Sequence, residues 1–113
     1  MGSIDGDALR GHLETMVLSV VEASDAHGYE ILRRLELRGA GRLVLKEGTL
    51  YPLLHRLEGA GLLRARWESE ETERRGPRRR MYSLTRRGKG ELQRRRTAFR
   101  EFVAIVGSIV EAT

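Results

Sequence analysis

The chain of 113 residues contains no cysteine. It can therefore form no disulfide, no thiolate metal site and no cysteine nucleophile, which agrees with the reducing cytoplasm. Long apolar runs are also missing: no stretch approaches the roughly 18 residues of a membrane span, and no basic segment precedes an apolar one at the N-terminus. We therefore expect a cytoplasmic protein that does not associate with a membrane.

Patterns typical of enzymes are missing as well. The sequence has no G-x-S-x-G nucleophile elbow and no glycine-rich loop that would cradle a phosphate. His12, His27 and His55 lack the i, i+4 spacing and the neighbouring acids of a metal site. His27 is instead expected to be a structural or capping residue. We therefore expect no catalytic residues, no metal and no cofactor.

Basic side chains are abundant and clustered. Lysine and arginine outnumber aspartate and glutamate by 21 to 16, for a formal net charge of +5, which favours a polyanionic partner. An arginine-rich composition could also spread this charge evenly, since Lys46 and Lys89 are the only lysines. Five arginines nevertheless fall within seven residues, at Arg74, Arg75, Arg78, Arg79 and Arg80. Their clustering favours a binding role over a general surface charge.

Apolar side chains recur at helical spacing in four segments. Ser24 and Asp25 are candidate N-caps for the second segment and Thr85 for the fourth, while glycines end the second and the third. Pro52 must lie in or just past the first turn of the third helix, where at most one ladder hydrogen bond is lost. The predicted helices cover residues 9–21, 26–38, 47–58 and 86–110.

Between the third and fourth helices the pattern changes to that of strands. Leu63, Ala65 and Trp67 alternate with charged residues, so the first strand of a hairpin has one buried face, with Trp67 in the core against the third helix. The return strand at residues 80–84 is expected to bury Tyr82 and Leu84. A brief alternation at residues 42–45 predicts a further short edge strand.

Helices followed by a β-hairpin with a basic tip form the order of a winged helix-turn-helix. We therefore predict a mainly α fold with a small β-hairpin, in which residues 1–84 are the DNA-binding domain and residues 85–113 a C-terminal dimerisation helix. An arginine run is often only a solvated loop, but its place at the hairpin tip favours double-stranded DNA as the partner. The predicted contacts are Lys46, Thr49, Tyr51, Pro52, His55, Arg56, Arg74, Arg75, Arg78, Arg79 and Arg80. Arg86, Arg87 and Lys89 either approach the duplex too or are solvated.

The last predicted helix is too long for its own domain to cover. About 25 residues make it roughly 37 Å long, whereas the preceding residues have an expected radius of gyration of roughly 12 Å. Its apolar stripe continues to the far end with a near-seven-residue repeat, which favours a partner helix in a homodimer. The alternative is that the stripe folds back on the first helix of the same chain. The predicted interface is Leu92, Phe99, Phe102, Val103, Val106, Ile109 and Val110.

Three segments together form a specific pattern: AHGYEILRRL (Ala26 to Leu35), KEGTLYPLLHRLEGAGLL (Lys46 to Leu63) and GPRRRMYSLT (Gly76 to Thr85). With them the chain resembles, over about residues 9–110, the PadR family of bacterial transcriptional regulators, in its short subfamily with one C-terminal dimerisation helix. Pro77 departs from the usual pattern, which has a second glycine there, and residues 81–83 replace a basic residue and paired aromatics.

The resemblance implies a ligand-responsive repressor that acts as a homodimer on a pseudo-palindromic operator. It also implies that a small aromatic or cationic effector could bind between the C-terminal helices, in a pocket lined by Met16, Phe99, Phe102 and Val103. Aromatic residues at helical spacing are also common in plain packing. A winged-helix module for protein–protein or RNA binding is the alternative function. An exposed apolar face on the third helix would favour that alternative, but the predicted face is polar and flanked by arginine.

Overall fold

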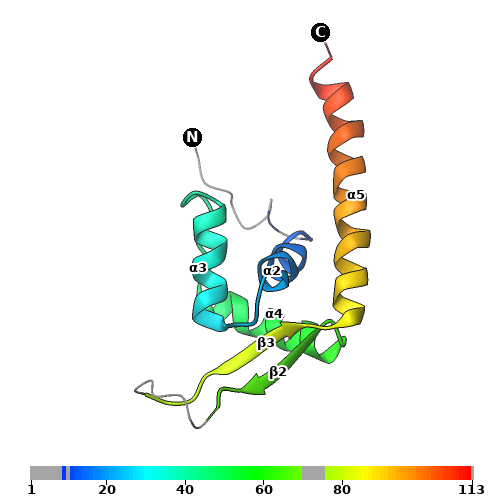
Figure 1. Ribbon diagram of the computed structural model, residues 1–113. Helices are drawn as coiled ribbons and strands as arrows, with labels where there is room; N and C mark the ends of the chain where they lie inside the picture. Colours follow the sequence, from blue (N-terminus) through cyan, green and yellow to red (C-terminus); the bar gives the residue numbers. More distant parts are fainter. Residues whose placement is uncertain (1–8, 10, 70–75, 113) are drawn as a thin grey trace.

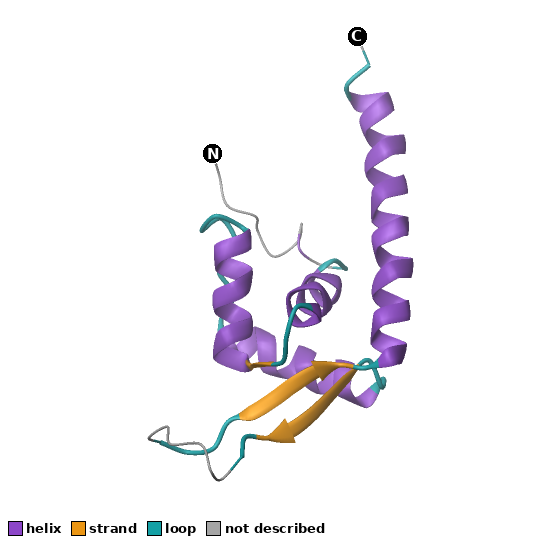
Figure 2. Ribbon diagram, viewed as in Figure 1, coloured by secondary structure: helices purple, strands orange, loops and turns teal. Residues whose placement is uncertain are grey.

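The computed structural model describes residues 9, 11–69 and 76–112. The elements are α2 (Leu13–Glu22), β1 (Ala26–His27), α3 (Gly28–Arg38), α4 (Glu47–Gly59), β2 (Leu63–Trp67), β3 (Arg80–Leu84) and α5 (Arg86–Val110). Figure 1 shows α3, α2 and α5 above the β2–β3 hairpin, with α4 behind its strands and α5 extending well beyond the other helices. Figure 2 shows that helix dominates and that the sheet is small, so the predicted mainly α winged helix-turn-helix fold is confirmed.

The core lies where α2, α3 and α4 meet. Helix α4 buries one face of leucines completely, and α2 and α3 bury their own apolar faces against it. Pro52 is the sixth residue of α4, so it lies just past the first turn and removes a single ladder hydrogen bond, as predicted. The largest fully buried side chains on these three helices are Val17, Leu18, Val20, Val21, Ile31, Leu50, Leu53, Leu54 and Leu57.

The sheet contains three antiparallel strands in the order β1-β3-β2. Strands β2 and β3 occupy the predicted ranges. Tyr82 is buried as expected, whereas Leu84 is only partly buried, packed against the core. The edge strand predicted at residues 42–45 is wrong, because that segment has no strand pairing and the outer edge of β3 is taken by β1. Leu43 is buried and Leu45 is partly buried against the core, while Val44 between them is exposed, so a loop without strand pairing produces the same alternation.

The second helix begins two residues later than predicted. Ala26 and His27 pair with Tyr82 and Met81 of β3 instead of forming a first helical turn. His27 is the N-cap of α3, and its Nδ1 accepts a hydrogen bond of 3.2 Å from the amide of Glu30. This confirms His27 as a capping residue and leaves the predicted caps, Ser24 and Asp25, in the preceding turn.

Arg34 of α3 fixes that turn. Its Nη1 donates hydrogen bonds to the backbone carbonyls of Val20 (2.9 Å) and Ser24 (2.8 Å), at the C-terminal end of α2. Carbonyls at a helix end have no partner within the helix and need an outside donor. The guanidinium therefore satisfies them and holds α3 at a fixed angle to α2.

The first turns of helix α5 pack one side, at Gly88 and Leu92, against the core of their own chain. Thr85 is its N-cap, as predicted, and the Thr85 Oγ1 accepts a hydrogen bond of 2.9 Å from the amide of Gly88. Leu92 is completely buried among the core residues. Its assignment to a dimer interface is therefore wrong, because the first turns of α5 pack against the chain's own core before the helix leaves it.

Gly88 marks the closest approach of α5 to the turn before β2. A Cβ placed on Gly88 would overlap the backbone carbonyl oxygen of Leu62, whereas a Cβ on Gly90 would meet nothing closer than 3.6 Å, at Arg94 Nη1. We expect Gly88→Ala to lower the free energy of unfolding by about 1–3 kcal/mol or more, since backbone must move. Gly90→Ala, the matched control, should raise it by up to about 1 kcal/mol. Urea unfolding measures both, and equal midpoints for the two variants would contradict this packing.

Candidate functional site

The exposed face of α4 is polar. Thr49, Tyr51, Pro52, His55 and Arg56 are all exposed, on the side of the helix opposite the buried leucines. Lys46 is the exposed N-cap residue of the same helix. Amides in the first turn of a helix lack carbonyl partners and attract anions. One helix therefore presents two hydroxyls, an imidazole, a guanidinium and an ammonium to solvent, as the sequence predicted.

The Tyr51 ring packs against the backbone of Gly28 on α3. A Cβ placed on Gly28 would come within 2.5 Å of the Tyr51 Oη and 2.8 Å of its Cζ, so the phenol ring lies directly over the Gly28 backbone. A cavity of about 280 Å³ adjoins this contact, and Tyr29, Pro77 and the arginines at positions 78–80 also line it. The N-terminus of α3, the centre of α4 and the base of the hairpin therefore share one surface.

The β2–β3 hairpin with its connecting residues 68–79, here called the wing, is tied to α4 by Arg80. The Arg80 Nη2 lies 3.1 Å from Glu58 Oε2, and its guanidinium carbon lies 5.3 Å from the centre of the Trp67 ring. Arg78 lies over the same ring at 6.0 Å. Burial raises the pKa of the neighbouring Tyr82 hydroxyl, which therefore stays neutral at physiological pH.

Trp67 is not the core residue that its alternation predicted, since its side chain is 54 % exposed. It pairs with Arg80 at the outer end of the sheet. It lines, with Tyr51, His55 and Glu58, an open hollow of about 640 Å³ between α4 and the wing. The alternation correctly predicted that Leu63 is buried, but it carried no information on how burial decreases along the strand, through the partly buried Ala65 to the exposed Trp67.

The remaining predicted arginines lie along the wing. Arg78 and Arg79 are exposed, and the Arg79 amide donates a hydrogen bond of 2.9 Å to Glu68 Oε2. The Arg79 Nη1 lies 2.9 Å from His27 Nε2, which brings this side chain to the N-terminus of α3. Arg74 and Arg75 lie outside the described residues. The structure thus brings the described wing arginines and the Tyr51 side of α4 together on one surface.

Arg56 lies on the opposite flank of α4. Its Nε is 3.8 Å from Glu14 Oε2 on α2, and its side chain is 63 % exposed. Glu14 and Glu58 are the acidic partners of Arg56 and Arg80, and sequence reasoning missed both. Only the tertiary arrangement pairs Glu14 with Arg56, whereas Glu58 could have been noticed as an acid beside the predicted basic face.

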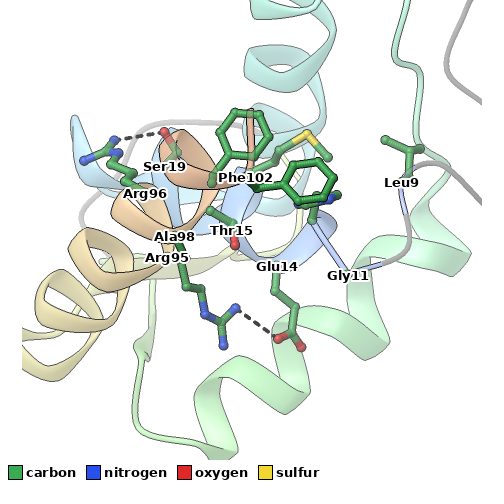
Figure 3. A pocket seen from close by; sticks show the side chains of 12 residues that line it. Leu9, Gly11, Glu14, Thr15, Ser19, Arg95, Arg96, Ala98 and Phe102 are labelled. Atoms are coloured by element: carbon green, nitrogen blue, oxygen red, sulfur yellow. Dashed lines mark hydrogen bonds and ion pairs between the residues drawn. The ribbon is translucent and has the colours of Figure 1, made fainter. Parts of the chain in front are cut away.

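A groove of about 700 Å³ runs between α2 and α5 (Figure 3). Met16, Phe99 and Phe102 line it, as predicted, but Val103 is not among its lining residues. The ring of His12 lies edge-on to Phe99, with 5.7 Å between ring centres, and 6.5 Å from Phe102. The aromatic residues of α5 therefore face an open groove rather than a filled core.

Ion pairs along this groove fasten α5 to α2. Arg95 Nη1 lies 3.3 Å from Glu14 Oε1, and Arg96 Nη2 lies 2.9 Å from Glu22 Oε1. The hydrogen bonds from Arg96 lower the pKa of Glu22, and those from Arg95 and Arg94 lower the pKa of Glu91. Glu22 and Glu91 are therefore ionised at neutral pH, and the Glu22–Arg96 pair between α2 and α5 is lost in acid, where Glu22 becomes protonated.

The apolar stripe of α5 is exposed from Phe99 onward. Its side chains are between 39 % and 74 % accessible, and among them Phe99 and Phe102 contact the ring of His12, the N-cap residue of α2. The fold-back alternative therefore holds for the near end of the stripe and leaves the far end uncovered by the described part of the chain. The exposed residues of the predicted stripe are Phe99, Phe102, Val103, Val106, Ile109 and Val110.

Neither a metal centre nor a membrane span is present in residues 9, 11–69 and 76–112. No group of three or more His, Cys, Asp or Glu side chains within these ranges is placed to hold a metal ion. Nor is any helix within them both long enough and apolar enough to cross a membrane.

Comparison with known proteins gives consistent matches. The family described as "Transcriptional regulator PadR-like family" matches residues 17–94. A transcriptional regulator from Clostridium thermocellum is 27 % identical, with a TM-score of 0.83 over 95 % of this chain and 98 % of that one. A PadR family regulator from Clostridium difficile is 30 % identical, with a TM-score of 0.78 over 88 % and 99 %. Bacillus subtilis PadR, solved in complex with operator DNA, is 26 % identical, with a TM-score of 0.63 over 75 % of this chain and 46 % of that one.

Proposed function

The chain belongs to the PadR-like family of transcriptional regulators, and on that premise we propose that it binds a pseudo-palindromic DNA operator as a homodimer. The observation that carries the proposal is the polar face of α4 beside the arginines of the wing. A relative of similar fold has been solved with operator DNA, which supports the same kind of partner here. The exposed face of α4 is polar, which does not favour the protein–protein alternative, and the relative's complex with operator DNA supports DNA over RNA.

In this proposal α4 enters the major groove. Its hydroxyl, imidazole and guanidinium groups are those that reach base edges and phosphates there. Lys46 and the amides at the start of α4 would bind a phosphate. Arg78 and Arg79 would neutralise phosphates along the backbone or lie in the minor groove, while Arg80, tied to Glu58, keeps the wing at a fixed position relative to α4.

The partner for the far end of α5 would be a second copy of the chain. Six apolar side chains along one stripe of this helix are exposed to solvent, and a stripe of this length on a monomeric protein would be a liability for solubility. Pairing with the same helix of another copy buries both stripes with two-fold symmetry. The two copies of α4 would then face the same side of a duplex, one in each half-site.

The groove between α2 and α5 would be the site of an aromatic or cationic effector that relieves repression. Its volume of about 700 Å³ falls in the range of roughly 300–1,000 Å³ that is usual for small-molecule sites. Phe99 and Phe102 belong both to this groove and to the exposed stripe. An occupant would therefore touch the proposed dimer interface directly.

Effector binding can be tested with flat aromatic dyes. We expect at least one dye to gain fluorescence on binding and to weaken operator binding by about 5- to 150-fold, the usual range of allosteric coupling. Thr15→Trp, which fills the groove from α2, should abolish dye binding. Ile105→Ala, an exposed position of α5 outside the groove lining, should leave it unchanged. If no dye in the library gains fluorescence or weakens operator binding, the proposed effector site is wrong.

The DNA-binding function itself can be tested by selecting fragments of the source genome on the immobilised protein. Enrichment of a shared pseudo-palindrome is the expected result. Fragments that share no sequence, or recovery of none, would contradict sequence-specific binding.

A further inference from the structure

Glu14 sits where three helices meet. From α2, its Oε1 accepts a hydrogen bond of 3.3 Å from Arg95 Nη1 on α5, and its Oε2 lies 3.8 Å from Arg56 Nε on α4. Arg95 is held in turn by Glu91, whose Oε1 accepts a hydrogen bond of 3.0 Å from Arg95 Nε. These residues form a network of alternating charges that runs from α5 through α2 to α4.

The two ends of this charge network face different surroundings. Glu14 and Arg95 are about one-third exposed, with side-chain exposures of 34 % and 29 %, and both line the groove, where Figure 3 shows the bond between them. Arg56 is 63 % exposed and belongs to the polar face of α4. One carboxylate thus connects the groove to a side chain that a duplex can reach.

Arg56 is also set apart from the wing. It follows Tyr51 by five residues, which places the two side chains about 140° apart around the helix axis. The Tyr51 flank of α4 is joined to the wing, where Glu58 binds Arg80, whereas the Arg56 flank is joined to α2 through Glu14. The two flanks of α4 are therefore fastened by separate ion pairs, and only the second has a partner that lines the groove.

We propose that Glu14 is a positioning residue that sets how strongly Arg56 binds DNA, and so links the groove to α4. The inference rests on the proposed DNA-binding function of α4. The Glu14 carboxylate competes with a DNA phosphate or base edge for the Arg56 guanidinium. Arg95 also binds this carboxylate and so weakens its attraction for Arg56. A ligand in the groove that binds Glu14 or Arg95 changes the strength of the Glu14–Arg56 ion pair. No displacement of the backbone is needed for this coupling.

The direct test compares two glutamates of α2 on one duplex, recovered by selection with the unmodified protein. Glu14→Gln should bind it about two- to fivefold more tightly, the effect expected for releasing an exposed ion pair. Glu22→Gln is the matched control: it removes the same charge from the same helix and also loses a pair with α5, through Arg96, without touching α4. It should leave the affinity unchanged.

A double-mutant cycle decides whether Glu14 acts through Arg56. In an Arg56→Ala background, Glu14→Gln should have no further effect on DNA affinity. Without DNA, the side-chain Nε–H signal of Arg56 in an NMR spectrum should shift in Glu14→Gln and stay in place in Glu22→Gln. This readout depends on the ion pair alone and not on the identity of the operator.

Each other outcome has its own meaning. Equal effects of the two glutamate substitutions on affinity would reduce the role of Glu14 to net charge and overturn the inference. An effect of Glu14→Gln that persists without Arg56, or an Arg56 signal that does not move, would overturn it too. If the unmodified protein recovers no duplex, the proposed DNA-binding function is wrong and the inference that rests on it falls too. This outcome is seen with the unmodified protein alone and needs no variant.

Discussion

Val106→Glu is expected to convert the protein from a dimer into a monomer or an unfolded chain, and to lower its affinity for the operator by more than about a hundredfold. Val106 is near the middle of the exposed stripe and, at 39 % exposure, is the least accessible of its members. In a dimer its side chain would be buried between two helices, where an unpaired charge costs several kcal/mol. A monomer would contact one half-site at a time and lose the joint binding of both.

The control for this substitution lies two residues earlier. Ala104 is exposed on the same helix and, at about 200° around its axis, lies on the side opposite Val106. Ala104→Glu should therefore remain a dimer and keep its operator affinity. Light scattering gives the mass of each variant, and circular dichroism shows whether α5 is still helical. A monomeric unmodified protein, or a dimeric Val106→Glu, would rule out the proposed interface.

Tyr51→Ala and Arg78→Ala are expected to weaken DNA binding in different ways. Tyr51 lies on the α4 face that would enter the major groove, fixed there by its contact with Gly28. Its loss should cost about 1–3 kcal/mol on the operator, a five- to 150-fold change, and less on scrambled DNA. Arg78 belongs to the wing and would mostly neutralise phosphate. Its loss should weaken binding to both duplexes equally and lower the salt dependence by about one unit.

Both variants can be measured by titrating labelled duplexes at several salt concentrations. Arg42→Ala is a matched control, because Arg42 is exposed on the loop before α4 and not on the proposed surface. It removes one arginine and should change the affinity little. Equal losses on the operator and on scrambled DNA for Tyr51→Ala would show that α4 does not read sequence. A loss confined to the operator for Arg78→Ala would show that the wing does.

Much of the fold could be predicted because its signals are local. The leucine spacing of α4 identifies its buried face, and the alternation in β2 and β3 gave both strands their observed bounds. By contrast, the strand at Ala26–His27 depends on its pairing with Tyr82 and Met81, far along the chain. No local pattern distinguishes its two residues from the first turn of a helix.

The errors at the site have a similar origin. The seven-residue repeat that joins Leu92 to Phe99 and Val106 indicates packing against another helix but not which chain supplies it. Leu92 is buried in its own chain, whereas Phe99 and Val106 are exposed. The pairing of Glu14 with Arg56 and Arg95 joins three helices, and nothing in the spacing of these residues predicts it. Sequence reasoning therefore missed the contacts between residues that are far apart in the sequence.

A footprint of the unmodified protein on the selected duplex tests the central claim most directly, when it is combined with the number of chains bound per duplex. A dimer of winged helices should protect two half-sites related by two-fold symmetry, about one helical turn or roughly 34 Å apart, with two chains per duplex. Protection should vanish on a scrambled duplex at the same protein concentration. A single protected half-site bound by one chain, or equal protection of the scrambled duplex, would contradict the account.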